Sequence, residues 1–184
     1  MTLTAVPVPL WLLDSSTFIN CCVISRVPLF VLLRSPLFFS EYVFRVELGI
    51  NAHHSTRTAA AEWVSRGKIG ISNLALADLD RISQLGTPRR IGLGEIASAI
   101  LAEREGGGVL CDDWKGRRWL QTRVTLSRWE SIEDVLLDAA QSGHVSEFDL
   151  DTFQQDLEKA RYTCRMNLRI EHLRRNANLK KRPQ

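Results

Sequence analysis

The sequence predicts an α/β domain with three layers: a mostly parallel sheet flanked by helices, followed by a C-terminal helical extension. Short apolar runs alternate with longer segments of helical periodicity, which is the pattern of βαβ units. Acidic residues also follow two of these runs directly, where buried parallel strands would end. The chain has 184 residues, 45% of them hydrophobic and 24% charged, which is typical of a globular protein.

The expected strands are the short apolar or alternating runs. The first is apolar throughout and ends at Asp14, which is typical of a strand buried on both faces. The stretch KIGIS alternates instead, which is typical of a half-buried strand. The predicted strands are 10–13, 37–39, 68–72, 109–111 and, as a last strand, 124–126.

The expected helices begin at capping residues and end near glycines. Ser15 and Ser16 are suitable N-caps after the first strand, and Gly67 and Gly106 are suitable terminators. The segment between Arg26 and Pro36 is unusually apolar, and we expect a loop there. The predicted helices are 16–26, 41–50, 58–65, 74–85, 94–104, 115–122, 130–141 and 149–161.

Charge is distributed unevenly along the chain. Residues 165–184 carry seven Lys or Arg and one acid, Glu171, so this tail has a net charge of +6 and the rest of the chain −3. We expect a core at 1–126, a helical part packed on it at 127–164, and a basic tail at 165–184 that is either disordered or a frayed helix. An acidic body with a basic arm indicates an acidic site and attraction to polyanions, although a solvated C-terminus explains the tail equally well.

Cysteine usage and hydropathy indicate a reduced, cytoplasmic protein. The four cysteines form no CxxC pair and no zinc-spaced cluster. The apolar N-terminal stretch is not preceded by basic residues, so it is a poor signal peptide. Charged residues and prolines interrupt the apolar stretch 18–39, so we expect no membrane span.

The candidate chemistry lies in acids that follow strands or begin helices. Asp14 follows the first strand, and Asp112 and Asp113 follow the strand at 109–111. Since the carboxyl ends of parallel strands share one edge, these acids are expected to approach one another. Glu95 begins a helix of small residues, and Glu47 lies in a mostly apolar helix. Helix capping is the alternative explanation for each aspartate, the helix dipole is the alternative for Glu95, and an ordinary surface position is the alternative for Glu47.

Several carboxylates in one pocket would bind a divalent cation. Two carboxylates about 4 Å apart repel by roughly 4 kcal/mol at an effective dielectric constant near 20. Either some of them are protonated or a cation neutralises them. Oxygen ligands without nearby His or Cys select Mg²⁺ or Mn²⁺, and such ions promote phosphodiester hydrolysis.

Four segments together resemble the PIN-domain nucleases: LLDSSTFIN at 12–20, EYVFRVEL at 41–48, LGEIASAILA at 93–102 and VLCDDWKGRR at 109–118. The likeness is an Asp closing the first strand with Ser two residues later, a helical Glu, a Gly-Glu that opens a helix, and an Asp pair after a later strand. It covers about residues 10–125. Glu41 competes with Glu47 for the helical position, and Asp112 competes with Asp113 for the last one.

This resemblance implies a ribonuclease that depends on Mg²⁺ or Mn²⁺, as in VapC-like toxins of toxin–antitoxin pairs. It also implies an antitoxin partner and a homodimer. In the roles carried over, metal ligands would come from the strand-end aspartates and Glu95, Glu47 would complete the catalytic set, and Ser16 would bind substrate or water. The resulting catalytic set is Asp14, Glu47, Glu95 and Asp113, and the metal ligands are Asp14, Glu95, Asp112 and Asp113.

Basic residues after the Asp pair are candidate phosphate contacts. Lys115, Arg117 and Arg118 begin the next predicted helix, and arginine can pair with phosphate through two hydrogen bonds. An exposed helix face explains them equally well. Trp114 and Trp119 could stack on bases, although core packing is the commoner role for aromatic residues at this spacing.

Two functional hypotheses remain, and a third has no support. The first is a metal-dependent endoribonuclease that hydrolyses RNA. The second is a catalytically inactive PIN-like module that binds RNA or a protein partner. A phosphotransfer or phosphatase domain is disfavoured because the sequence contains no glycine-rich phosphate loop and no evident covalent nucleophile.

Overall fold

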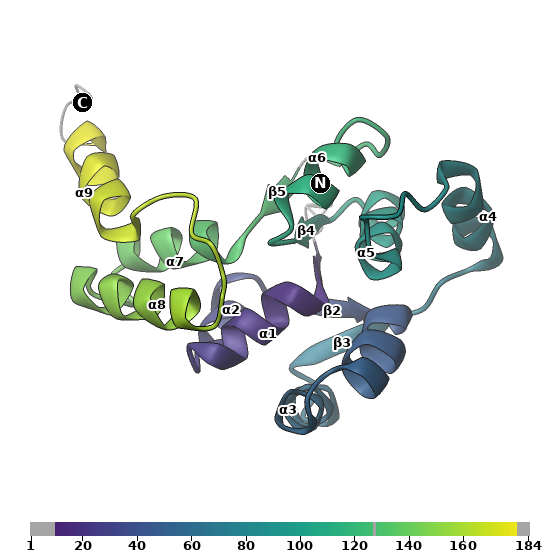
Figure 1. Cartoon of the computed structure of the whole chain (residues 1–184), viewed down its shortest axis with the longest axis horizontal. Helices are drawn as coiled ribbons and strands as arrows, with labels where there is room; N and C mark the ends of the chain where they lie inside the picture. The colour runs from purple at the N-terminus through teal and green to yellow at the C-terminus, as the bar shows by residue number, and fades with distance from the viewer. Residues whose placement is uncertain (1–9, 127, 180–184) are drawn as a thin grey trace, which may run out of the picture.

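A five-stranded, all-parallel sheet forms the centre of the computed structural model, which describes residues 10–126 and 128–179. The strand order is β3-β2-β1-β4-β5 (Figure 1). The predicted α/β class with a parallel sheet is therefore confirmed. The strands are β1 (Trp11–Leu13), β2 (Leu37–Ser40), β3 (Ile69–Ser72), β4 (Gly108–Leu110) and β5 (Arg128–Glu130).

Strand β1 lies in the middle of the sheet and is buried on both faces. Leu12 pairs with Phe38 of β2 on one side and with Val109 of β4 on the other. Successive side chains point to opposite faces, so Trp11 and Leu13 join one hydrophobic cluster and Leu12 joins another. This explains why the β1 sequence is apolar without alternation.

Helices cover both faces of the sheet. Helix α5 packs on β1, β2 and β4 from one face, whereas α1 lies on the other face with α2, α7 and α8 (Figure 1). The helices are α1 (Ser15–Val23), α2 (Val27–Leu33), α3 (His54–Ser65), α4 (Leu76–Leu85), α5 (Leu93–Glu105), α6 (Trp114–Leu120), α7 (Ile132–Gln141), α8 (Glu147–Lys159), α9 (Leu168–Leu179) and the π-helix η1 (Val43–Asn51).

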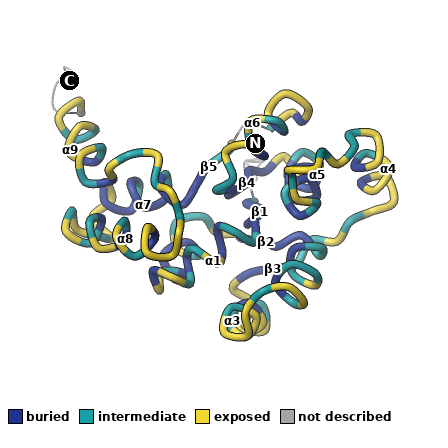
Figure 2. Tube along the Cα trace, viewed as in Figure 1, coloured by how far each residue is buried: buried dark blue, intermediate teal, exposed yellow. Residues whose placement is uncertain are grey.

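Helix α5 is buried along most of its length, as its dark tube in Figure 2 shows. Every residue from Ile96 to Ala102 is buried. Small residues in this stretch let the helix approach the sheet closely, because alanine and serine need little room. Tight packing fixes the start of α5, which carries Glu95, against the sheet edge.

Two local expectations are wrong. The apolar segment after Arg26 is not a loop, because helix α2 buries Val27, Leu29 and Phe30. The last strand is β5 at Arg128–Glu130 rather than 124–126. Val124 is buried in a cluster with α5 and α6 instead, so its apolar character reflects packing of a turn rather than a strand. Glu130 belongs to that strand, so the helix predicted at 130–141 begins later, at Ile132.

The predicted helix at 41–50 is a π-helix over most of its length. Its buried residues are Val43 and Leu48, both with no exposed surface and five positions apart, which matches the i to i+5 repeat of a π-helix. Ile50, which an α-helical repeat would bury with Val43, is 68% exposed. π-Helices are rare, and their short form, the single-turn π-bulge, is frequent at functional sites.

The basic C-terminal region is helical as far as the structure describes it. Helix α9 packs on α7 and α8. Arg169 forms ion pairs with Glu147 and Asp151 of α8, at 3.3 and 3.1 Å. Part of the basic charge is therefore neutralised within the chain, while residues 180–184 lie outside the described part. Among the helices within the described ranges, none has both the length and the apolar character required to cross a membrane.

Candidate functional site

Asp14 stands at the carboxyl end of the central strand and caps helix α1. Its Oδ2 accepts hydrogen bonds from the backbone N–H of Ser16 at 3.2 Å and from the Ser16 hydroxyl at 2.5 Å. The residue is only 2% exposed, and burial raises the pKa of its carboxyl to about 6. Ser16 opposes that shift through its hydrogen bonds, and Glu47 adds to it through its charge.

Glu47 reaches the same edge from the π-helix η1. Its Oε2 accepts a hydrogen bond from the Ser15 hydroxyl at 2.6 Å, and its Oε1 accepts one from the backbone N–H of Gly94 at 3.2 Å. Glu41 instead forms an ion pair with Arg45 at 2.8 Å. The structure therefore brings Glu47 to the site, and not Glu41.

Glu95 lies in the first turn of α5 and is the most perturbed carboxyl group at this edge. Burial raises its pKa to about 8, and the charges of Asp14, Asp113 and Glu47 raise it further. Its Oε2 is buried and has no hydrogen-bond partner among the described residues. A buried carboxyl oxygen without a partner is costly, so Glu95 either retains a proton or requires a cation.

Glycines make room for these carboxylates. A Cβ atom on Gly94 would overlap the carboxylate of Glu47, and a Cβ atom on Gly116 would overlap Oε2 of Glu95. Gly92 lies nearby, but a Cβ atom there would make ordinary contacts at 3.7 Å or more. The backbones of α5 and α6 thus approach the acids at two positions where a larger residue would displace the carboxylate.

The two adjacent aspartates after β4 have different surroundings. Asp113 caps helix α6, where its Oδ1 accepts from the backbone N–H groups of Lys115 at 2.7 Å and Gly116 at 3.2 Å. Asp112 accepts from the Ile132 backbone N–H and from the Asn20 amide, both at 2.7 Å. Burial raises the pKa of Asp112 to about 6. Asp113 therefore belongs with Glu95, whereas Asp112 connects the strand end to α1 and α7.

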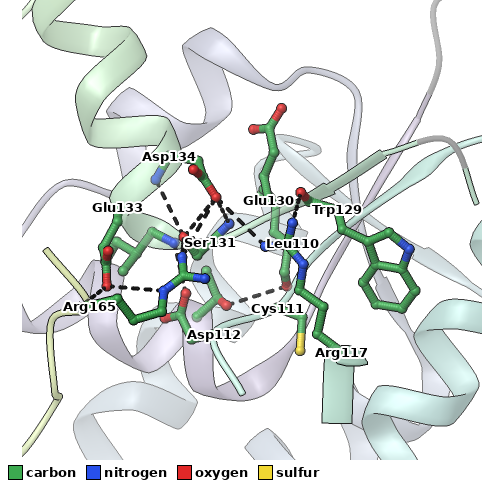
Figure 3. Close-up of polar contacts among 12 residues, drawn as sticks. Leu110, Cys111, Asp112, Arg117, Trp129, Glu130, Ser131, Glu133, Asp134 and Arg165 are labelled. Atoms are coloured by element: carbon green, nitrogen blue, oxygen red, sulfur yellow. Dashed lines mark hydrogen bonds and ion pairs between the residues drawn. The ribbon is translucent and has the colours of Figure 1, made fainter. Parts of the chain in front are cut away.

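A separate polar network lies beyond Asp112, at the start of α7 (Figure 3). Glu133 is fully buried, and its Oε1 accepts from the Tyr162 hydroxyl at 3.0 Å and from the Arg165 backbone N–H at 2.9 Å. The Arg165 guanidinium lies 3.6 Å from that oxygen and donates to the Ser131 hydroxyl at 2.6 Å. This network attaches the segment between α8 and α9 to the sheet.

The predicted phosphate contacts fall into two groups. Lys115 and Arg118 are exposed on α6. Arg117 is partly buried, donates to the Trp129 carbonyl at 2.6 Å and lies 3.7 Å from Asp134 (Figure 3). Its guanidinium therefore holds α6 against β5 and α7. Ser16, the other predicted substrate contact, is bound to Asp14.

Oxygen ligands from Asp14, Glu95 and Asp113 have the chemistry that Mg²⁺ or Mn²⁺ requires, and the unpartnered Oε2 of Glu95 lies beside Gly116, within reach of the charges of Asp14 and Asp113. Across residues 10–126 and 128–179, however, no three His, Cys, Asp or Glu side chains already have the geometry of a metal site. The donor set fits a hard cation, but its members would have to converge to coordinate one.

Three residues of this edge, Ser15, Asn20 and Gly116, were not predicted as part of the site. Ser15 was considered only as a helix cap, yet its hydroxyl binds Glu47. Asn20 and Gly116 were not considered, although Asn20 binds Asp112 and Gly116 accommodates Glu95. Ser15 directly follows Asp14, and Gly116 comes three residues after Asp113. This closeness in sequence to a candidate acid is the one signal that could have indicated these two residues.

Comparison of the sequence with protein-family models and with curated proteins gave no match, so the assignment of a role to this edge depends on its geometry and chemistry.

Proposed function

We propose that this protein is a divalent-metal-dependent endoribonuclease that hydrolyses RNA phosphodiester bonds at the carboxyl edge of its sheet. One observation carries the proposal: Asp14, Glu47, Glu95 and Asp113 come from four separate elements and influence one another at this edge. None of the ion pairs formed among the described residues includes any of the four. Acids gathered in this way without a cationic side chain are suited to binding a metal ion.

Asp14, Glu95 and Asp113 would hold the Mg²⁺ or Mn²⁺ ion. Asp112 is less suited, because both of its oxygens accept hydrogen bonds from the chain. The bound ion would supply Lewis acidity toward the phosphate and lower the pKa of water, which is the usual contribution of metal ions to phosphodiester hydrolysis.

The chain's own residues position the acids. The Ser16 hydroxyl fixes the orientation of Asp14, and the Ser15 hydroxyl together with the Gly94 N–H fixes Glu47. Glu95 carries a proton at neutral pH because its pKa is near 8, and it must lose that proton to ligate a cation. Metal affinity is therefore expected to rise with pH.

The direct test measures degradation of a fluorescently labelled single-stranded RNA with Mg²⁺, with Mn²⁺ and with EDTA. The wild type and the surface control Asp156→Asn should cleave it in the presence of metal. Asp14→Asn should lose about 100-fold or more of the rate, because the charge that anchors the site at β1 is removed. Equal cleavage by Asp14→Asn and wild type, with both retained in EDTA, would contradict the proposal.

The second candidate is a non-catalytic domain that binds RNA or a protein. It is favoured by the lack, within the described ranges, of three side chains already arranged around a cation. Calorimetric titration with Mn²⁺ separates the two functions: saturable binding that Asp14→Asn abolishes supports the nuclease. RNA binding that EDTA leaves unchanged, without any Mn²⁺ binding, supports the second candidate. The antitoxin partner and the homodimer stay predictions from the resemblance.

A further inference from the structure

A pocket of about 420 Å³ adjoins the carboxylate cluster. One wall belongs to α1 and to the turn after β4, and the other wall belongs to the segment that follows α8. This volume lies within the range of small-molecule sites, roughly 300–1,000 Å³. The residues that line the pocket include Ser16, Asn20, Asp113, Trp114, Arg161 and Tyr162.

We propose that this pocket, hereafter the nucleotide pocket, binds one nucleotide of single-stranded RNA next to the bond that is cleaved. Trp114 stacks on the base, and Arg161 contacts a phosphate. The proposal deepens the proposed function, on which it rests for the identity of the ligand. It assigns the C-terminal segment a direct part in substrate binding.

Trp114 is positioned for stacking on a base. It is the first residue of α6, directly after Asp113, and its side chain is 50% exposed. The other wall of the pocket stands opposite it. Every base has an aromatic face, so a half-exposed tryptophan beside a phosphodiesterase site suits single-stranded RNA of any sequence. The Lys115 ammonium, 5.9 Å from the ring centre, adds positive charge at the rim.

Arg161 has an unusual backbone conformation that presents it at the pocket. Its φ is +67°, in the left-handed region that residues other than glycine rarely adopt. The chain on either side holds this turn: the Tyr162 N–H donates to the Leu157 carbonyl at 2.9 Å. Among the ion pairs formed by described residues, none includes the Arg161 guanidinium. A strained, exposed and unpaired arginine beside an acidic site is suited to binding phosphate.

The pocket wall is anchored to the sheet through Glu133. That buried carboxylate accepts from the Tyr162 hydroxyl and from the Arg165 backbone N–H, on the C-terminal side of Arg161. Asp112, which binds Ile132 at the start of the same helix, lines the opposite wall. The two walls are therefore connected through α7, and the pocket is built into the fold rather than formed by a loose segment.

The experiment locates the base directly by photocrosslinking. The full chain is mixed with a pentanucleotide RNA containing 5-iodouridine in Ca²⁺, an oxygen-binding cation. After irradiation, mass spectrometry maps the modified peptide. A crosslink at Trp114 or Tyr162 supports the proposal, because both line the pocket. A crosslink confined to Trp119 or to the basic tail would overturn it.

Variants test the two contacts by RNA affinity, measured by fluorescence polarisation. Trp114→Ala should weaken binding by about 5- to 100-fold, whereas Trp114→Phe retains most of the affinity. Arg161→Gly removes the guanidinium and suits the positive φ, so the fold is preserved. It should lower the slope of log affinity against log salt by about 0.7. Unchanged affinity and slope in both truncations would overturn the proposal.

Matched controls are Phe148→Ala, which removes another exposed aromatic, and Arg66→Ala, which removes another exposed arginine, at the C-cap of α3. Both should bind RNA like the wild type. The two proposals fail separately. If Asp14→Asn loses cleavage but the crosslink maps elsewhere, only the nucleotide pocket is wrong. If the crosslink maps to Trp114 while cleavage is independent of Asp14 and metal, the pocket stands and the nuclease assignment fails.

Discussion

Two acidic regions meet at the end of β4, and they differ in how their charges are balanced. Toward α7, the buried Glu133 lies 3.6 Å from the Arg165 guanidinium and accepts two further hydrogen bonds. Toward α5, burial raises the pKa of Glu95 to about 8, and the charged groups that add to this rise are all acids, Asp14, Asp113 and Glu47. Asp112 and Asp113, adjacent in sequence, belong to opposite sides of this division.

The two regions share one feature and differ in another, and only the second marks a candidate site. Both Glu95 and Glu133 have a buried Oε2 without a hydrogen-bond partner among the described residues, so an unpartnered oxygen does not distinguish them. The sign of the neighbouring charge does. Glu133 is neutralised by an arginine and stabilises the fold, whereas the Glu95 region destabilises it unless a proton or a cation is bound.

The largest effect, on stability, is expected when the Glu133 carboxylate is removed from its contacts with Arg165 and Tyr162. Glu133→Ala should lower the free energy of unfolding by about 3 kcal/mol, because Arg165 and the Tyr162 hydroxyl lose a buried partner. Urea denaturation measures it. Glu41→Ala, which removes an exposed ion pair with Arg45, should cost only about 0.5 kcal/mol. Equal losses in the two variants would show that the α7 network does not anchor the C-terminal part.

A smaller effect, on metal affinity, is expected when an added atom takes the space of the Glu95 carboxylate. Gly116→Ala places a Cβ atom onto Oε2 of Glu95, so the carboxylate must move away from Asp14 and Asp113. Mn²⁺ affinity should fall by about 10- to 100-fold, as measured by calorimetry. The control is Gly92→Ala, where the added atom makes only ordinary contacts. Equal Mn²⁺ affinity in both variants would exclude Glu95 as a ligand.

The different charge balance of the two regions also predicts how stability depends on pH. Without metal, the folded state keeps the Glu95 proton up to about pH 8, whereas the unfolded state releases it near 4.5. The free energy of unfolding should therefore fall as pH rises from about 5 to 8. Glu95→Gln should remove about 2 kcal/mol of that fall in EDTA, less than the full shift because the side chain is partly solvated.

Thermal unfolding in EDTA across this pH range measures the Glu95 effect. Addition of Mn²⁺ should stabilise the wild type at pH 8 and leave Glu95→Gln nearly unchanged. Glu171→Gln is the control, because its carboxylate is paired with Arg174 and its pKa is lowered. A wild type whose stability rises with pH between 5 and 8 would contradict the assignment of a protonated Glu95.

The sequence was sufficient to predict the parallel sheet, apart from its last strand, and to single out the acids that follow its strands. Asp14 directly follows one apolar strand, the pair Asp112–Asp113 comes soon after another, and Glu95 follows a glycine at a helix start, so their local patterns indicate their positions. The parallel arrangement then brings them to one edge. These are short-range signals, and the regular alternation of strands and helices turns them into a spatial prediction.

What the sequence did not predict depends on contacts between distant segments. The pairing of Glu133 with Tyr162 and Arg165 joins residues about thirty positions apart, and no local pattern marks it. Helix α2 was predicted as a loop because its burial depends on contact with α7. Helix α7 lies much later in the sequence, so no local pattern marks this contact. The π-helix was missed because its five-residue repeat differs from the helical period used to find it.

The position of β1 between β2 and β4 governs when the acidic edge can exist during translation. Asp14 leaves the ribosome about a hundred residues before Asp113, and β4 cannot pair with β1 until then. A nascent chain therefore holds an incomplete set of carboxylates for most of its synthesis. If the proposed activity is correct, the messenger RNA and the ribosome would be shielded from the polypeptide until its fourth strand has emerged.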